Sequence, residues 1–262
     1  MDLLKQTRTV LVTGGARGIG FRAAQLLAAE GASLALVDIN RDGVAAAADR
    51  LSSESGTKVC GFAADIGDPD SVRRMAREVE GRVGPADILI NSAAVVDDKL
   101  FLDSDSADWE RTVRICLLGP MNLIRTFAPT MVTRGFGRII CLASDSARLG
   151  QARLSYYAAA KAGVIALCKS VAQELGTSGI TVNVISPGAT NTELRQEREQ
   201  SLLAQMGAEK YERRQRSVLK MYPLGRLGEP HDIAAMIAFV ASDHASWLTG
   251  QVISVNGGFA MP

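Results

Sequence analysis

Short apolar runs alternate along the chain with longer segments that have helical spacing. The short runs are apolar at nearly every position, which is typical of strands in a parallel sheet covered on both faces. They comprise residues Thr9–Val12, Ser33–Val37, Val59–Ala63, Ile88–Ile90, Arg138–Leu142, Ile180–Ile185 and Val252–Val255. The helical segments comprise Ile19–Glu30, Arg41–Ser53, Asp70–Arg82, Ala107–Arg134, Ser155–Leu175 and His231–Ala241. This alternation predicts a doubly wound α/β fold with a mostly parallel, seven-stranded sheet.

Glycines support this division, and a polar insertion interrupts it. Gly31, Gly84, Gly135 and Gly179 follow four of the helical segments, where a left-handed residue ends a helix favourably. No linker or repeat divides residues 1–262, so we expect one domain. Residues 190–224 form a charged insertion, which is either a solvated helical excursion or a mobile lid over a substrate site.

Composition and charge exclude several classes of protein. Hydrophobic residues make up 47% of the 262 residues and the formal net charge is +1, so the chain is neither disordered nor suited to nucleic acid or an anionic membrane. The four cysteines are widely spaced, and His231 and His244 have no ligand-spaced neighbours, so neither a disulfide framework nor a metal site is expected. The N-terminal segment lacks the apolar stretch of a signal peptide, so we expect a cytoplasmic protein.

A glycine-rich turn follows the first predicted strand and precedes a helix. In T-G-G-A-R-G-I-G, Gly14 permits a sharp turn, Gly18 lets the backbone approach a pyrophosphate, and Gly20 permits close packing of helix and strand. The N–H groups at the start of the helix favour phosphate. The turn therefore predicts a Rossmann-type dinucleotide site, although a glycine-rich turn also occurs without a ligand.

Asp38 ends the second predicted strand, about 20 residues after the glycines, where a carboxylate accepts a hydrogen bond from the ribose 2′-hydroxyl. The same charge repels a 2′-phosphate, so Asp38 favours NAD. Arg17 and Arg41 favour NADP, because either one can neutralise a phosphate. We give Asp38 more weight because of its position at the strand end.

Tyr157 and Lys161 lie four residues apart in a helical segment, so both side chains fall on one helix face. A nearby ammonium stabilises phenolate and lowers the pKa of tyrosine, which makes Tyr157 a candidate general acid and base. Ser144 ends the fifth strand, at the edge where open sheets bind ligands. These three residues predict interconversion of a carbonyl and an alcohol.

Taken together, the motifs resemble the short-chain dehydrogenase/reductase family over nearly the whole chain. Ser144 lies thirteen residues before Tyr157-x-x-x-Lys161, as in that family. The other matching motifs are T-G-x-x-x-G-I-G at Thr13–Gly20, Asp65-Ile66, Asn91-Ser92-Ala93-Ala94, Asn183-x-x-x-Pro187-Gly188, Pro223-Leu224-Gly225-Arg226-x-Gly228 and Thr249-Gly250-Gln251 with Asn256-Gly257-Gly258.

The resemblance implies an NAD(P)-dependent oxidoreductase that forms homotetramers. It assigns Tyr157 as acid and base, Lys161 as the group that lowers its pKa and binds the nicotinamide ribose, and Ser144 as the group that orients the carbonyl. Tyr157 and Lys161 would therefore contact cofactor as well. The other implied cofactor-binding residues are Gly14, Arg17, Ile19, Gly20, Asp38, Asp65, Ile66, Asn91, Ala93, Pro187, Gly188, Thr190 and Thr192.

Two residues depart from the family pattern. Cys116 stands where the family places an asparagine whose backbone carbonyl helps hold a proton-relay water, and Ala94 replaces a glycine. Cys116 is either a buried inert thiol or a redox-sensitive one. It also leaves open a non-catalytic, dinucleotide-binding sensor.

The substrate is predicted only as a class. We expect hydride transfer between NAD(H) and a secondary alcohol or ketone, such as a hydroxyacyl-CoA or an alicyclic alcohol. The alternative enzyme is an NADPH-dependent 3-oxoacyl reductase. Arg148 and Arg153, in the loop after the fifth strand, either bind an anionic substrate group or are solvated or in a subunit contact.

Overall fold

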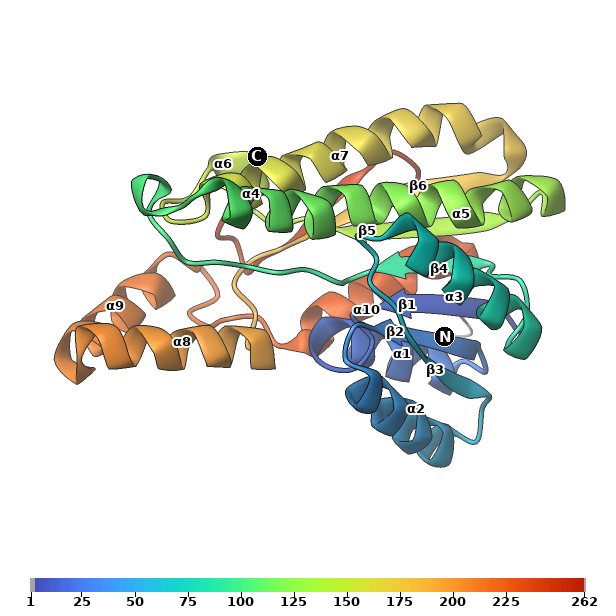
Figure 1. Cartoon of the computed structure of the whole chain (residues 1–262), viewed down its shortest axis with the longest axis horizontal. Helices are drawn as coiled ribbons and strands as arrows, with labels where there is room; N and C mark the ends of the chain where they lie inside the picture. The colour runs from blue at the N-terminus through green and yellow to red at the C-terminus, as the bar shows by residue number, and fades with distance from the viewer. Residues whose placement is uncertain (1–2, 262) are drawn as a thin grey trace.

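A computed structural model describes residues 3–261 as alternating strands and helices (Figure 1). The strands are β1 (Thr9–Thr13), β2 (Ser33–Asp38), β3 (Val59–Ala63), β4 (Ile88–Asn91), β5 (Gly137–Leu142), β6 (Ile180–Pro187) and β7 (Val252–Val255). The helices are α1 (Gly18–Ala29), α2 (Arg41–Ser55), α3 (Pro69–Arg82), α4 (Ser106–Val113), α5 (Gly119–Arg134), α6 (Ser146–Leu149), α7 (Ser155–Leu175), α8 (Glu193–Met206), α9 (Ala208–Lys220) and α10 (Pro230–Ala241).

All seven strands lie in one sheet in the order β3-β2-β1-β4-β5-β6-β7, and every pairing is parallel. The predicted doubly wound Rossmann fold is therefore confirmed, with a wholly parallel sheet. The order reverses between β1 and β4, and ligands of such sheets bind beyond the carboxyl ends of the strands at this point.

Alternate strand residues enter two apolar cores, one on each face of the sheet. Val10 and Val12 of β1 pack with α1, α2 and α10, whereas Leu11 between them packs with α3, α5 and α7. Both faces of β1 are thus covered by helices, which explains why its sequence is apolar throughout. Figure 1 shows the two helical layers on either side of the sheet.

The long helix expected over Ala107–Arg134 is interrupted. Five residues, Arg114–Leu118, form a π-helical turn between α4 and α5. Pro120 has no N–H to donate to the carbonyl four residues earlier, at Cys116, and this explains why the α-helical hydrogen bonding changes at this point. Apolar residues recur at helical spacing throughout this segment, so the apolar pattern did not indicate the change in hydrogen bonding.

The same segment is the one helix within residues 3–261 that passes a length and hydropathy test for a membrane span. The test is met over Ser106–Arg134, with a mean hydropathy of 1.2. In the fold, Leu123, Phe127 and Met131 of α5 are buried against the sheet, so these apolar residues belong to the core.

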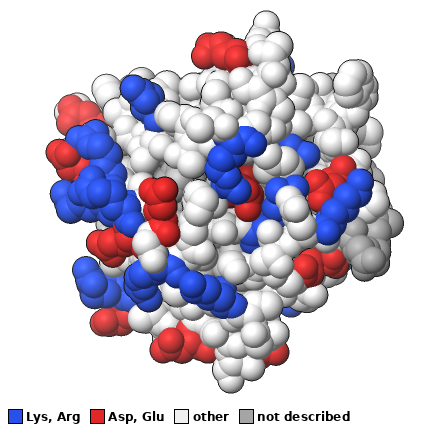
Figure 2. Space-filling view, turned by 90° about the vertical axis from the view of Figure 1, so that its right-hand side faces the viewer, with Lys and Arg blue, Asp and Glu red and all other residues white. Residues whose placement is uncertain are grey.

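The charged insertion forms two helices, α8 and α9, which Figure 1 shows set apart from the sheet. Elsewhere, acidic and basic side chains are interspersed on the face drawn in Figure 2. This mixture agrees with the near-zero formal net charge of the chain.

Candidate active site

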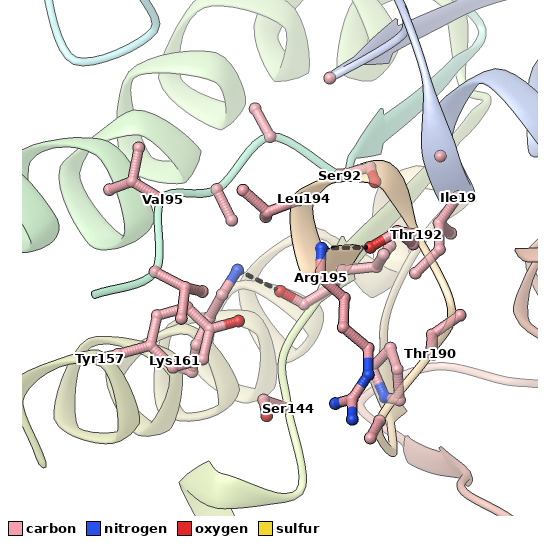
Figure 3. Close-up of a pocket in the computed structure, with 18 of the residues that line it drawn as sticks. Ile19, Ser92, Val95, Ser144, Tyr157, Lys161, Thr190, Thr192, Leu194 and Arg195 are labelled. Carbon is pink, nitrogen blue, oxygen red and sulfur yellow. Dashed lines mark hydrogen bonds between the residues drawn. The ribbon is translucent and has the colours of Figure 1, made fainter. Parts of the chain in front are cut away.

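A cavity of about 520 Å³ opens beyond the carboxyl ends of β1, β2, β4, β5 and β6 (Figure 3). Its volume is in the range of small-molecule sites. All the residues predicted to be catalytic, and all those predicted to bind cofactor except Gly20 and Asn91, line it. The structure thus brings one set of residues, dispersed from Gly14 to Thr192, to a single site.

The glycine-rich turn forms one end of this cavity. Gly14 and Gly18 have φ angles of +63° and +61°, a conformation that L side chains rarely adopt. Gly20 lies behind the turn, where an added Cβ would stand 2.3 Å from the carbonyl oxygen of Gly14. Gly20 therefore supports the shape of the turn from the helix side and does not line the cavity.

Asp38 and Arg17 flank this turn. One carboxylate oxygen of Asp38 accepts from the Ala16 N–H at 3.4 Å and the other from the Asn40 N–H at 3.1 Å, so backbone groups hold the carboxylate at the end of β2. Arg17 forms an ion pair with Glu197 of α8. A residue of the insertion, Glu197, therefore already pairs with the Arg17 guanidinium, which was one of two candidate partners for a 2′-phosphate.

Asp65 and Asn91 occupy different settings. Asp65 lines the cavity, accepts from the Gly67 N–H at 2.8 Å and pairs with Arg114 of the π-helical turn at 2.7 Å. Asn91 is completely buried behind the cavity, and its side-chain oxygen accepts from the Thr13 hydroxyl at 2.7 Å. Asn91 thus joins the ends of β4 and β1, and it does not line the cavity.

The Ser144 hydroxyl is oriented by its neighbour Ser146. Its oxygen accepts from the Ser146 N–H at 3.2 Å and from the Ser146 hydroxyl at 2.9 Å. With two donors on its lone pairs, Ser144 keeps its own proton for a third partner. Ser146 was not predicted as a site residue, because two serines separated by one residue in a loop do not indicate that they form a hydrogen bond.

Tyr157 and Lys161 lie one turn apart on α7 as predicted, and both are at least 90% buried. Burial raises the pKa of Tyr157, the charge of Arg198 and a hydrogen bond with Ser144 lower it, and burial dominates. Lys161 donates to the Leu142 carbonyl at 2.7 Å, and its ammonium is 5.8 Å from the centre of the tyrosine ring. The pKa of Tyr157 is therefore raised overall and not lowered as expected, because desolvation outweighs the charges around the phenol.

The segment after β6 forms the opposite wall. Pro187, Gly188, Thr190 and Thr192 all line the cavity. The Thr190 hydroxyl donates to the Gly188 carbonyl at 3.0 Å, and the Thr192 hydroxyl caps α8 by accepting from a backbone N–H in its first turn. These threonines therefore fix the path by which the chain leaves the sheet and enters the insertion.

Cys116 lies in the π-helical turn and is completely buried, beside Tyr157 and Leu154. Its thiol donates to the Val95 carbonyl, with the atoms 3.4 Å apart. Cys141 and Cys168 are also buried, whereas Cys60 is partly exposed. This burial favours the reading of Cys116 as an inert thiol, because reactive cysteines need access and a stabilised thiolate.

A thiol reagent applied to the native protein is expected to modify Cys60 first and to leave Cys116 unmodified. Mass spectrometry of peptides after timed labelling checks this, and all four cysteines should react once the protein is unfolded. Rapid labelling of native Cys116 would instead support a redox-sensitive thiol.

The loop arginines lie outside the cavity. Arg148 donates to the Ser254 hydroxyl at 2.8 Å, and Arg153 pairs with Asp98. The arginines that do line the cavity are Arg195 and Arg198 of α8 and Arg214 of α9. No motif or spacing distinguishes these three arginines from the other charged residues of the insertion.

Residues 3–261 contain no group of three or more histidine, cysteine, aspartate or glutamate side chains able to hold a metal ion. The polar side chains that line the cavity carry hydroxyl, phenol, carboxylate, ammonium and guanidinium groups.

Comparisons with known proteins place this site in a family. The family described as enoyl-(acyl carrier protein) reductase matches residues 14–260. An uncharacterized short-chain type dehydrogenase/reductase of Sinorhizobium fredii is 38% identical over 98% of both chains. The chain is also 37% identical to the 3-oxoacyl-[acyl-carrier-protein] reductase of Staphylococcus aureus, over 98% of this chain and all of that protein. The acetoacetyl-CoA reductase of Allochromatium vinosum is 35% identical, over 97% and 99%. The chain belongs to the short-chain dehydrogenase/reductase family of oxidoreductases.

Proposed function

We propose that this enzyme transfers a hydride between NAD(H) and a secondary alcohol or ketone. One observation carries the proposal: Ser144, Tyr157 and Lys161 line the same cavity as a glycine-rich turn at the start of a helix. The cavity therefore combines a place for a dinucleotide with an acid and base for carbonyl chemistry.

The residues at the turn fit a nicotinamide dinucleotide. An added Cβ on Gly18 would point toward Thr192 across the cavity and occupy space beside the N-terminus of α1. The helix N-terminus suits the pyrophosphate, Asp38 suits the ribose hydroxyls, and Lys161 and Thr190 lie farther along the same cavity. The bound cofactor would supply or accept the hydride.

The protein's own residues then handle the proton and the oxygen. Ser144, held by Ser146, donates a hydrogen bond to the substrate oxygen. Tyr157 donates its proton to that oxygen during reduction and takes one from the alcohol during oxidation. Lys161 places a positive charge beside the ring, where it favours the phenolate that oxidation requires.

The relatives favour an acyl skeleton for the substrate. Two of them are named for the reduction of 3-oxoacyl-[acyl-carrier-protein] and acetoacetyl-CoA. We therefore propose a 3-oxoacyl or 3-hydroxyacyl skeleton, carried either as a free acid or as a thioester such as a hydroxyacyl-CoA, and an alicyclic alcohol is the other candidate. A panel of such alcohols and ketones with both cofactors tests the reaction, and the absence of turnover across the panel would favour a dinucleotide-binding sensor.

Purified protein is expected to bind NADH at least about 10-fold more tightly than NADPH. The Asp38 carboxylate repels a 2′-phosphate, and Arg17 is engaged by Glu197. Quenching of protein fluorescence during titration with each cofactor measures both affinities. In Asp38→Ser the preference should shrink, whereas tighter binding of NADPH by the unaltered protein would favour an NADPH-dependent 3-oxoacyl reductase.

The two reaction directions are expected to respond differently to pH. Because burial raises the pKa of Tyr157, the phenol stays protonated through neutral pH, as reduction requires. The reduction rate should therefore be level up to about pH 10, the usual tyrosine pKa, whereas oxidation should accelerate as pH rises. Profiles of kcat at saturating substrate check both slopes, and an oxidation rate that falls with rising pH would exclude Tyr157 as the base.

Two further expectations belong to this proposal. Helices α8 and α9 act as a lid over the substrate, and the chain assembles as a homotetramer. The lid is supported by the lining residues that α8 and α9 contribute to the cavity and by the Arg17–Glu197 ion pair that joins it to the glycine-rich turn.

A further inference from the structure

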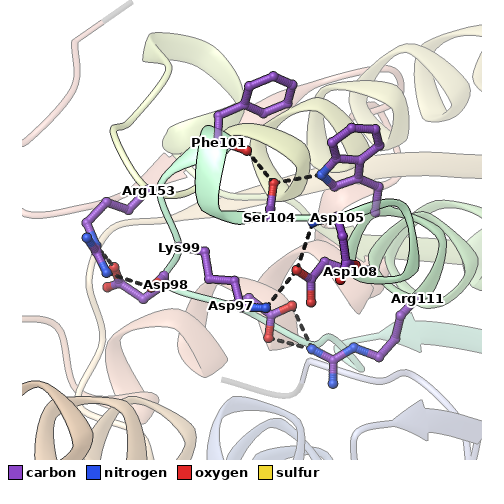
Figure 4. A network of polar contacts seen from close by, with 10 residues as sticks. Asp97, Asp98, Lys99, Phe101, Ser104, Asp105, Asp108, Arg111 and Arg153 are labelled. Carbon is purple, nitrogen blue, oxygen red and sulfur yellow. Dashed lines mark hydrogen bonds and ion pairs between the residues drawn. The ribbon is translucent and has the colours of Figure 1, made fainter.

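The insertion carries more positive than negative charge into the substrate end of the cavity. Glu199 of α8 lies within ion-pair distance of Arg195 at 3.0 Å and of Arg214 at 2.8 Å. Asp98, in the loop after β4, lies 2.8 Å from Arg198. Asp98 also pairs with Arg153, as Figure 4 shows. Four guanidinium groups therefore share two carboxylates in this cluster.

These arginines are not ordinary surface charges. The side chains of Arg195, Arg198 and Arg214 are only 13%, 22% and 27% exposed, and all three line the cavity. A buried charge without a matching opposite charge is unfavourable. Burial lowers the pKa of Arg195; Glu199 opposes this, and the like charges of Arg198 and Arg214 add to it. The cluster therefore carries a net positive charge, because its two carboxylates do not balance four guanidinium groups.

Two donors in the cluster also lack well-directed acceptors. Within residues 3–261, Nη2 of Arg195, Nε of Arg198 and also Oε1 of Glu199 are buried and make no hydrogen bond. A carboxylate oxygen of Glu199 lies 3.0 Å from the Arg195 nitrogen, and one of Asp98 lies 2.8 Å from the Arg198 nitrogen. Each pair is therefore attracted electrostatically, but its N–H group does not form a hydrogen bond. Buried donors of this kind call for an acceptor.

The cluster is close to the reacting group. The charge of Arg198 lowers the pKa of Tyr157, which places the guanidinium in electrostatic range of the phenol. Figure 3 shows Arg195 with Ser144 and Tyr157 around the same cavity. Apolar side chains line the space between these polar groups, among them Val95, Leu154, Val218, Met221 and Phe259.

We propose that Arg195, Arg198 and Arg214 bind a carboxylate carried by the substrate itself, so that the substrate is a hydroxy or oxo acid with an apolar body. This inference rests on the proposed function and makes its substrate class specific. A carboxylate matches the forked donors of arginine and supplies the missing negative charge.

The test compares acids with matched neutral and carrier-linked forms. The substrates are 3-hydroxybutyrate and 2-hydroxycyclohexanecarboxylate, their methyl esters and their CoA thioesters. For the unaltered enzyme, kcat/KM should be higher for the acids. Arg195→Gln should raise KM for the acids about 10- to 100-fold, the range for one hydrogen bond to a charged group, and change KM for the esters less than about 3-fold. The variant should fold, because Glu199 retains Arg214.

Matched variants separate recognition from general damage. Arg213→Gln removes an exposed arginine of α9 that pairs with Glu209, and it should leave every KM unchanged. Arg195→Lys keeps the charge without the forked geometry and should restore part of the acid affinity. Equal losses for acids and esters, or a preference for thioesters over acids, would overturn the proposal.

A binding measurement keeps this inference separate from the proposed function. Calorimetry with cyclohexanecarboxylate and the NADH-loaded enzyme reports on the arginines without turnover. Binding by the unaltered protein and its loss in Arg195→Gln would support the carboxylate site, even if the panel of alcohols gave no activity. Undetectable binding by the unaltered protein would contradict it. Turnover of esters without acid binding would refute the carboxylate site alone and leave hydride transfer standing.

Discussion

Replacing Tyr157 by phenylalanine is expected to reduce kcat for hydride transfer by about 10²- to 10⁴-fold, the usual contribution of a general acid or base. The variant removes only the hydroxyl that exchanges a proton with the substrate oxygen. The ring remains to fill its place beside Cys116 and Leu154, so the fold and the affinity for NADH should be retained. Steady-state rates in both directions, with fluorescence titration of NADH, measure the two effects separately.

Ser146→Ala provides a graded comparison for that result. It removes one of the two hydrogen bonds that orient the Ser144 hydroxyl, so kcat should fall by a smaller factor than in Tyr157→Phe. Near-normal turnover in Tyr157→Phe would contradict the assigned mechanism outright.

Adding a methyl group at Gly20 is expected to destabilise the protein by at least about 3 kcal/mol and to weaken NADH binding. The new Cβ would stand 2.3 Å from the carbonyl oxygen of Gly14, and a backbone atom cannot swing aside as a side chain can. The glycine-rich turn must then shift away from α1. Thermal unfolding should show a Tm lower by roughly 6–12 °C for a chain of this size.

Gly81→Ala is the matched control for this substitution. Gly81 is exposed on α3, and an added Cβ there meets no atom within 4 Å. Alanine loses less backbone entropy than glycine on folding, so this variant should be up to about 1 kcal/mol more stable than the unaltered protein. Equal Tm values for Gly20→Ala and the unaltered protein would show that the turn does not pack as described.

The order of strands and helices could be predicted because buried parallel strands and amphipathic helices have different apolar spacing. Val10, Leu11 and Val12 are all buried since helices cover both faces of β1, and such a run is visible in the sequence. The π-helical turn was missed because Pro120 changes hydrogen bonding without changing the apolar pattern. The insertion that forms α8 and α9 could be predicted only as a helical excursion or a lid, without helix bounds, because few of its side chains enter the core.

Site residues could be predicted where they form a motif of closely spaced positions on one helix, or where they lie at the carboxyl ends of neighbouring strands. Ser144, Tyr157, Lys161 and Asp38 meet at one cavity for that reason. The role of Asn91 depends on a contact with a distant segment, the hydroxyl of Thr13 on β1. The role of Arg195 depends on its burial at the cavity, which its position four residues before Glu199 does not indicate. The raised pKa of Tyr157 likewise results from burial. The four-residue spacing of Tyr157 and Lys161 does not indicate how deeply either side chain is buried.

Transfer of deuterium from labelled NADH to a ketone tests the central claim most directly. NADH carrying two deuterium atoms at the reactive nicotinamide carbon is incubated with the enzyme and an oxo acid, and the product is analysed by NMR. The account predicts one deuterium on the carbinol carbon of a single stereoisomer, with no such product from Tyr157→Phe on the same timescale. Product without deuterium, or equal labelled product from both proteins, would contradict it.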